Sequence, residues 1–143
     1  MSIKRKTKTV KLILSEFNKT QEAITIGELL KKFDKVMDKT TVYRIIDRLE
    51  NSNLIHSFND YDGTKRFAKG KKNIFSNKKN NNHPHFQCED CGISSCIPIK
   101  ISIPEIPNYL IKSAEHIFTG QCADCRNELW YFKFFLFTIF KLV

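Results

Sequence analysis

Apolar residues in the first half of the chain recur with the period of an α-helix. In three segments they occupy positions i, i+3, i+4 and i+7, which share one face of a helix. These segments are residues 10–17, 26–33 and 42–49. Such short helices are unstable alone, so we predict that they pack their apolar faces on one another. Asp38 is placed to cap the third helix, and residues 51–53 to end it.

A β-hairpin is predicted directly after the third helix. Two short runs, residues 54–58 and 64–68, flank an Asn/Asp/Gly turn at residues 59–63. Three helices followed by a hairpin form the plan of a winged helix-turn-helix, whose last helix enters the DNA major groove. We therefore expect an α+β protein that begins with a winged helix-turn-helix.

Beyond the hairpin, the pattern predicts a small α/β module. Isoleucines alternate with mostly polar residues from Ile93 to Ile103, which predicts a strand with Pro98 at a sheet edge. A short helix over residues 104–110 and a strand over residues 111–119 follow. A sheet of this size would pair with its copy in a homodimer, and a two-fold protein matches a two-fold DNA operator.

Charge and cysteine content differ between the two halves. The residues before His83 carry a net charge of +10 and the residues from His83 onward −1, and all five cysteines follow Gln87. A basic first half indicates a polyanionic partner, because Lys and Arg displace counterions from phosphates, although solubility alone is an alternative. We expect a DNA-binding domain over 1–69, a hinge over 70–82, a zinc-containing dimerisation domain over 83–126 and an apolar tail over 127–143.

Two C-x-x-C pairs carry the clearest chemical signal. Cys88 with Cys91 and Cys122 with Cys125 can each present two thiolates from a tight turn. Together they make a tetrahedral four-thiolate Zn²⁺ site, which is closed and serves to fold a small module. A redox C-x-x-C is the competing interpretation, but a single redox pair would not need a duplicate.

The outward face of the third helix carries side chains suited to DNA. Hydroxyl groups bind phosphates, and arginine forms bidentate bonds to guanine or phosphate. An ordinary solvated face is the alternative for the helix taken alone, and the basic hairpin argues against it. The predicted contacts to double-stranded operator DNA are Thr40, Thr41, Tyr43, Arg44, Arg48 and, on the hairpin, Lys65.

These residues carry a resemblance to the ferric uptake regulator (Fur) family. It rests on Thr41-Val42-Tyr43-Arg44, Leu49 and Asn53-Leu54-Ile55, and it spans residues 9–126. The family usually has glycine where Asn53 stands, and asparagine also tolerates positive φ. The resemblance implies a metal-responsive homodimeric repressor whose four paired cysteines hold a structural zinc.

A second, regulatory metal site is implied by the histidines before the first cysteine pair. His83 and His85 share one side of an extended strand and can chelate one ion. The resemblance adds Cys96, where many relatives carry a carboxylate ligand, and His116, near a ligand histidine of relatives. This set would take Zn²⁺ or Fe²⁺, and two nitrogens with a thiolate suit zinc better. Solvent-facing histidines beside a buried thiol are the alternative.

Two ligand positions of the family carry no donor here. The family's site usually takes a histidine just before the second helix, where Ala23 or Ile24 stands, and an acidic residue from the end of the hairpin, where Ala68 stands. We expect His56 on the surface, with substitution for a missing ligand as the alternative. The missing donors favour a second hypothesis, a constitutive winged-helix DNA-binding protein with a purely structural zinc.

Other function classes find little support. The sequence shows no P-loop, no paired carboxylates and no Ser/His/Asp order, so we expect neither an enzyme nor a small-molecule substrate. Residues 1–11 lack the apolar segment of a secretory signal, which predicts a cytoplasmic protein with reduced thiols.

The apolar tail has no assigned role. Residues 129–143 are fewer than the about twenty needed to span a bilayer, so we expect no membrane contact. The alternatives are an interfacial anchor, an added dimer element and an unselected extension, and the last is preferred because the family typically ends soon after its last cysteine pair.

Overall fold

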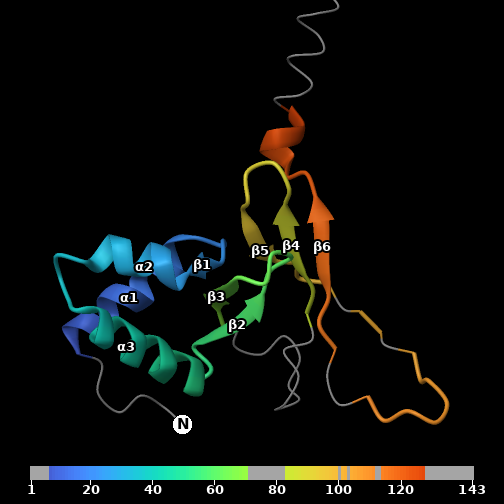
Figure 1. Ribbon diagram of the computed structural model, residues 1–143, viewed down its shortest axis with the longest axis horizontal. Coiled ribbons are helices and arrows are strands. Elements are labelled where there is room, and N and C mark those ends of the chain that lie inside the picture. The colour runs from blue at the N-terminus through green and yellow to red at the C-terminus, as the bar shows by residue number, and fades with distance from the viewer. Residues whose placement is uncertain (1–6, 71–82, 100, 103, 112–113, 128–143) are drawn as a thin grey trace, which may run out of the picture.

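A computed structural model of the chain describes residues 7–70, 83–99, 101–102, 104–111 and 114–127. Three helices and a hairpin come first, and a second sheet follows (Figure 1). In chain order the elements are α1 (Lys8–Lys19), β1 (Ile24–Thr25), α2 (Ile26–Phe33), α3 (Lys39–Asn51), β2 (Ile55–Asn59), β3 (Lys65–Lys69), β4 (His85–Cys88), β5 (Ser94–Cys96) and β6 (Ile117–Gly120).

The three predicted helices are confirmed, and their apolar faces meet in one core. Each helix begins at a side chain that accepts a hydrogen bond from a first-turn N–H. Thr7 caps α1, Thr25 forms a capping box with Glu28 on α2, and Asp38 caps α3 as predicted. The core consists of Val10, Ile13, Phe17, Leu29, Phe33, Val42, Ile45, Ile46, Leu49, Ile55 and Phe67.

The predicted hairpin is also confirmed. Strands β2 and β3 pair antiparallel, and the short strand β1, which the sequence pattern did not predict, adds to the far side of β3. Asp60 shapes the turn. Its buried carboxylate accepts hydrogen bonds from the N–H groups of Asp62 and Thr64 at 3.1 and 2.8 Å, and from Arg66 Nε at 2.7 Å.

The second sheet differs from its prediction. The strand expected from Ile93 to Ile103 is reduced to β5, because prolines remove strand donors and Ile99 is 48% exposed. Residues 104–110 form a turn instead of a helix, since Pro107 and the positive φ of Asn108 (68°) are incompatible with one. The strand expected over residues 111–119 is shorter in the structure, where β6 has four residues. Strand β4 lies between its neighbours, antiparallel to β5 and parallel to β6.

The hairpin lies between the helices and the second sheet (Figure 1). Ile55 and Phe67 belong to the helical core, whereas Phe58 faces the other way. The backbone also joins the two halves, because the N–H of Ala23 donates to the carbonyl of Ser94 at 2.7 Å. Both faces of the hairpin are therefore covered.

Residues 71–82 of the predicted hinge and residues 128–143 of the predicted apolar tail lie outside the described residues. Among the helices that the structure describes, none combines the length and the apolar composition that a membrane span requires.

Candidate metal sites and nucleic-acid interface

Two pairs of cysteines from distant parts of the chain meet at one point. The first pair spans the turn after β4, and the second follows β6. Because β4 and β6 are parallel neighbours, both pairs leave the sheet at the same end. Gly92 adopts φ 72° just after the first pair and turns the chain. The four sulfur atoms, of Cys88, Cys91, Cys122 and Cys125, lie within 4.8 Å of one another.

The distances between these sulfurs suit a tetrahedral zinc ion. Cys91 Sγ lies 3.8 Å from Cys122 Sγ, and two thiolates bound to zinc at about 2.3 Å are about 3.8 Å apart. The N–H of Cys122 donates to Cys88 Sγ at 3.3 Å. Hydrogen bonds from the backbones of Cys91 and Cys122 lower the pKa of Cys88 to about 6, whereas the neighbouring thiols raise the pKa of Cys125. A bound metal ion would favour the thiolate form of all four cysteines. The cluster fits a structural zinc.

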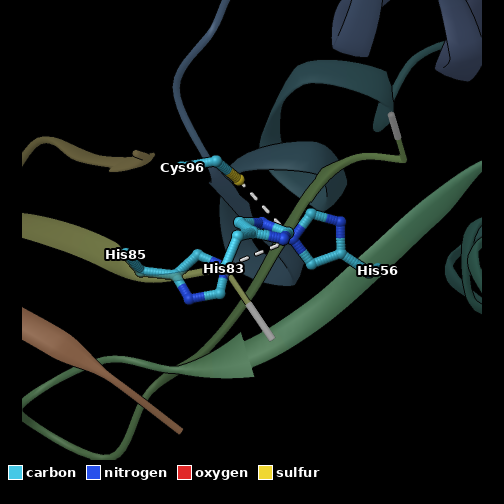
Figure 2. Close-up of side chains that lie close together, drawn as sticks. All are labelled: His56, His83, His85 and Cys96. Carbon is cyan, nitrogen blue, oxygen red and sulfur yellow. Dashed lines mark hydrogen bonds between the residues drawn. The ribbon is translucent and has the colours of Figure 1, made fainter. Parts of the chain in front are cut away.

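A second group of donors lies where the hairpin meets the second sheet (Figure 2). His85 and Cys96 are opposite each other in the ladder between β4 and β5. His83 precedes β4 and is two residues from His85, so it shares the same side. His56 comes from β2, on the hairpin. One donor atom from each of these four residues lies within 4.8 Å of all the others.

The donor atoms converge closely. The Nε2 atoms of His56 and His85 are 3.2 Å apart, and Cys96 Sγ is 3.5 Å from His56 Nε2. The ring of His83 is centred 4.8 Å from the rings of both other histidines. Figure 2 shows the side chains of this group directed toward one another. Three imidazole nitrogens and one thiolate suit Zn²⁺, which prefers four nitrogen and sulfur ligands.

The environment of His85 favours its neutral imidazole. His56 and His85 are each 6% exposed. Burial lowers the pKa of His85 to about 3, and repulsion from the charged forms of His83 and His56 contributes. His85 is therefore neutral near pH 7, and the neutral ring is the form that binds a metal.

His56 is the donor that the sequence prediction named only as the alternative. We expected it on the surface, and that expectation is wrong, because only 6% of it is exposed. The signal was the presence of apolar residues on both faces of its strand. Ile55 points to the helical core and Phe58 to the second sheet, so a residue two positions from Phe58 is covered as well.

The two family ligand positions without a donor lie beside this group. Ala23 and Ala68 are buried with Phe58, and Cys96 packs against them. His56 is directly opposite Ala68 in the β2–β3 ladder, where paired Cα atoms are about 4.5–5.5 Å apart. The hairpin thus offers a donor from β2 where the resemblance expects one from β3.

His116 does not join the donor group, contrary to our expectation. It lies just before β6, and its contribution there is its backbone carbonyl, which accepts from the N–H of His85 at 2.9 Å. Because β6 is on the other side of β4 from β5, this position is separated from Cys96 by a whole strand.

The outward face of α3 is accessible. Thr40, Arg44 and Arg48 are exposed, and Tyr43 is half exposed. Thr41 is partly used in capping, since its hydroxyl donates to the Asp38 carboxylate at 2.6 Å and its N–H donates to the same group at 2.9 Å.

Lys65 lies at the start of β3, exposed, near the same side of the hairpin as the end of α3. Its Nζ is 3.4 Å from a carboxylate oxygen of Glu50 and 5.1 Å from the centre of the Phe67 ring. The carboxylate therefore reduces the positive charge that Lys65 can offer to a phosphate.

Solved structures of metal-dependent regulators resemble this fold at low sequence identity. Fur from Helicobacter pylori is 19% identical, with a TM-score of 0.55 over 85% of this chain and 82% of that chain. Fur from Francisella tularensis with iron is 15% identical, with a TM-score of 0.55 over 88% and 98%. A zinc uptake regulator in complex with zinc and DNA is 17% identical, with a TM-score of 0.57 over 86% and 84%.

No curated protein sequence matches the chain. The sequence pattern of the ferric uptake regulator family matches residues 2–119, which is most of its length. The motifs on α3, the fold and the two groups of metal donors agree with that match. The chain belongs to the ferric uptake regulator family.

Proposed function

We propose that this protein is a metal-dependent, sequence-specific DNA-binding regulator that represses transcription as a homodimer. Members of its family are metal-responsive transcription regulators. The observation that carries the proposal is the group of His56, His83, His85 and Cys96. One of its donors belongs to the hairpin that packs on the helices, and the other three belong to the second sheet and its approach.

This arrangement supports a simple mode of regulation. A bound divalent ion supplies bonds between His56 and the donors of the second sheet. His56 is on the strand that follows α3, so its position constrains the orientation of α3. Restraining α3 in each subunit of a dimer would set the distance between the two recognition helices. Operator half-sites one helical turn apart require a fixed distance of this kind.

The DNA contact would come from the outward face of α3. Arg44 and Tyr43 are the proposed readers of base edges, with Thr40, Thr41, Arg48 and Lys65 as backbone contacts. The exposure of Thr40, Arg44, Arg48 and Lys65 supports these roles. The zinc uptake regulator with a similar fold was solved with DNA, which agrees with the proposal.

The two metals would have different roles. The four-thiolate group offers no open position once a tetrahedral ion is bound, so we assign it a structural Zn²⁺. The histidine-rich group is the regulatory site. Its three nitrogens and one sulfur favour Zn²⁺ over a hard ion such as Mn²⁺.

A constitutive DNA-binding protein with only the structural zinc is the second candidate. The resemblance places ligands at Ala23 or Ile24 and at Ala68, and the lack of a donor there favours this candidate. The burial of His56 beside Ala68 argues against it, because it returns a donor to the hairpin.

Metal titration of DNA binding tests the proposal. Operator sequences are first selected from random DNA with the purified full chain, and its affinity is then measured with the four-thiolate zinc retained and the second metal added or chelated. We expect the second ion to raise operator affinity by about 5- to 150-fold. Equal affinity in both states would support the constitutive protein, and failure to select any sequence would overturn the DNA-binding role.

A further inference from the structure

Gln87 lies on β4 two residues after His85, and neither metal group uses it. Every second residue of a strand points to the same face, so the Gln87 side chain lies on the same side of β4 as His85, toward the hairpin. Only 7% of this residue is exposed. A buried primary amide needs partners for its oxygen and its nitrogen.

Both ends of the Gln87 amide bind the turn of the hairpin. Its Oε1 accepts from the N–H of Tyr61 at 2.8 Å, and its Nε2 donates to Asp62 Oδ2 at 3.3 Å. The turn itself is braced by the buried Asp60 carboxylate, which holds the N–H of Asp62 and the side chain of Arg66. Through these hydrogen bonds, Gln87 is connected to the turn and, by way of Asp60 and Arg66, to β3.

The amide contact continues the metal group along the same two strands. His56 and Phe58 are two residues apart on β2, and Phe58 stacks on His85 with ring centres 3.6 Å apart and planes 17° apart. Three contacts therefore follow one another along the interface between the hairpin and β4: the metal group at His56, the Phe58–His85 stack and the Gln87 amide. Without the amide contact, β2 would still meet β4 at His56 and at the Phe58–His85 stack, but the turn at Tyr61 and Asp62 would lose its hydrogen bonds to β4.

We propose that Gln87 is a positioning residue that fastens the hairpin turn to β4 and thereby makes operator affinity depend on the metal group. This inference rests on the proposed function. The metal group and the Phe58–His85 stack hold the middle of β2, and the Gln87 amide adds a hydrogen-bonded contact at the turn, Tyr61 and Asp62. Gln87 would not bind the ion. Its substitution should therefore change how strongly the metal raises operator affinity, and not the affinity for the metal.

A charge change with a matched rescue tests this role. In Gln87→Glu the new carboxylate can still accept from the N–H of Tyr61, but it repels Asp62. Adding Asp62→Asn supplies an amide that can donate to this carboxylate and restores the contact with donor and acceptor exchanged. Operator affinity is measured with and without the second metal for the full-length wild type, the single variant and the double variant.

We expect Gln87→Glu to reduce the metal-dependent gain in operator affinity by about tenfold, the size of one to two buried hydrogen bonds. The metal-free operator affinity and the zinc content of the four-cysteine group should stay unchanged, which excludes general unfolding. The double variant should recover most of the gain.

The outcomes separate the inference from the proposed function. A metal-responsive wild type with an equally responsive Gln87→Glu variant would overturn the inference alone. A double variant that stays as impaired as the single one would also overturn it. A wild type that ignores the second metal would overturn both.

Discussion

At the scale of single residues, the position of one histidine decides whether the hairpin contributes a donor to the group of His83, His85 and Cys96. His56 and His116 are similar in sequence terms, since each is a lone histidine beside apolar residues. Only His56 has its ring nitrogen within reach of the other donors, at 3.2 Å from His85 Nε2. The difference between them arises from strand order, because β2 packs toward the donors and β6 does not.

His56→Ala should weaken the second metal without affecting the first. Removing a direct ligand should lower metal affinity at least as much as removing a hydrogen-bond partner of a ligand, which costs about 10- to 100-fold. Chelator competition on the protein with its four-thiolate zinc retained measures this. His116→Ala is the matched control and should bind two ions as the wild type does. A His56→Ala variant with unchanged second-metal affinity would remove His56 from the site.

Arg44→Ala should abolish specific operator binding and leave the zinc content intact. A bidentate contact between arginine and guanine contributes about 1–3 kcal/mol of discrimination in each half-site, and Arg44 is exposed on the outward face of α3. Footprinting on a selected operator measures the loss. Lys31→Ala removes an exposed cation from α2 instead and should weaken binding only slightly. Footprints that are unchanged in Arg44→Ala would refute its role.

At the scale of elements, the hairpin works as a middle layer, unlike a wing that is solvated on one face. Ile55 and Phe67 face the helices, while Phe58 and Ala68 face the second sheet. A strand covered on both sides explains why its polar residue, His56, needs a specific set of partners. It also places the metal group between the two halves of the chain.

The contact between α1 and α2 includes a carboxylate that should make stability depend on pH. Glu16 is 7% exposed and accepts from Lys19 at 2.7 Å and from Lys32. The hydrogen bond from Lys19, and after it the one from Lys32, lowers the pKa of Glu16 below its ordinary value of 4.5. A pKa that is lower in the folded state means that the stabilisation is complete above pH 4.5 and is lost as the pH falls through the folded-state value.

Glu16→Gln should therefore lower the free energy of unfolding by about 0.5–1 kcal/mol at pH 7, with a smaller difference from wild type at pH 3. Urea unfolding at both pH values measures it on the zinc-loaded protein. Glu22→Gln, which changes an exposed carboxylate, is the control and should match wild type. A Glu16→Gln difference that grows on acidification would contradict the assignment.

At the scale of the whole molecule, the four-cysteine group should hold the second half of the chain together. Strands β4 to β6 total eleven residues and bury few apolar side chains of their own. A sheet of this size needs additional restraints to be stable. The four sulfurs that follow β4 and β6 lie close enough together to provide one by binding a zinc ion. Zinc binding would then supply folding free energy directly.

Cys125→Ser should remove the structural zinc, reduce the β content in circular dichroism and lower thermal stability, because a tetrahedral site with three thiolates binds zinc much more weakly. Cys96→Ser is the matched control, since it removes one thiol from the other group. That variant should keep one tightly held zinc. Metal analysis that found a full complement of tight zinc in Cys125→Ser would exclude the four-thiolate site.

Local patterns predicted the first half of this protein well. The apolar quartets on α1, α2 and α3 are short-range signals, and so are the Asp38 cap and the turn before β3. The second half was predicted less well, because Ile99 belongs to an alternating sequence pattern and yet is 48% exposed. An alternating pattern forms a strand only where a neighbouring strand pairs with it and its apolar face is buried.

The two candidate metal sites also differ in how far the sequence predicts them. The four-cysteine group was predicted from its two C-x-x-C pairs, because cysteines at this spacing are typical of zinc sites. The sequence alone therefore determined the helices, the hairpin, the family and the cysteine group. Only the tertiary structure decided that His56 joins His83, His85 and Cys96, and that His116 does not. The physical reason is that the donors come from strands whose packing depends on contacts far apart in the sequence, which no local pattern records.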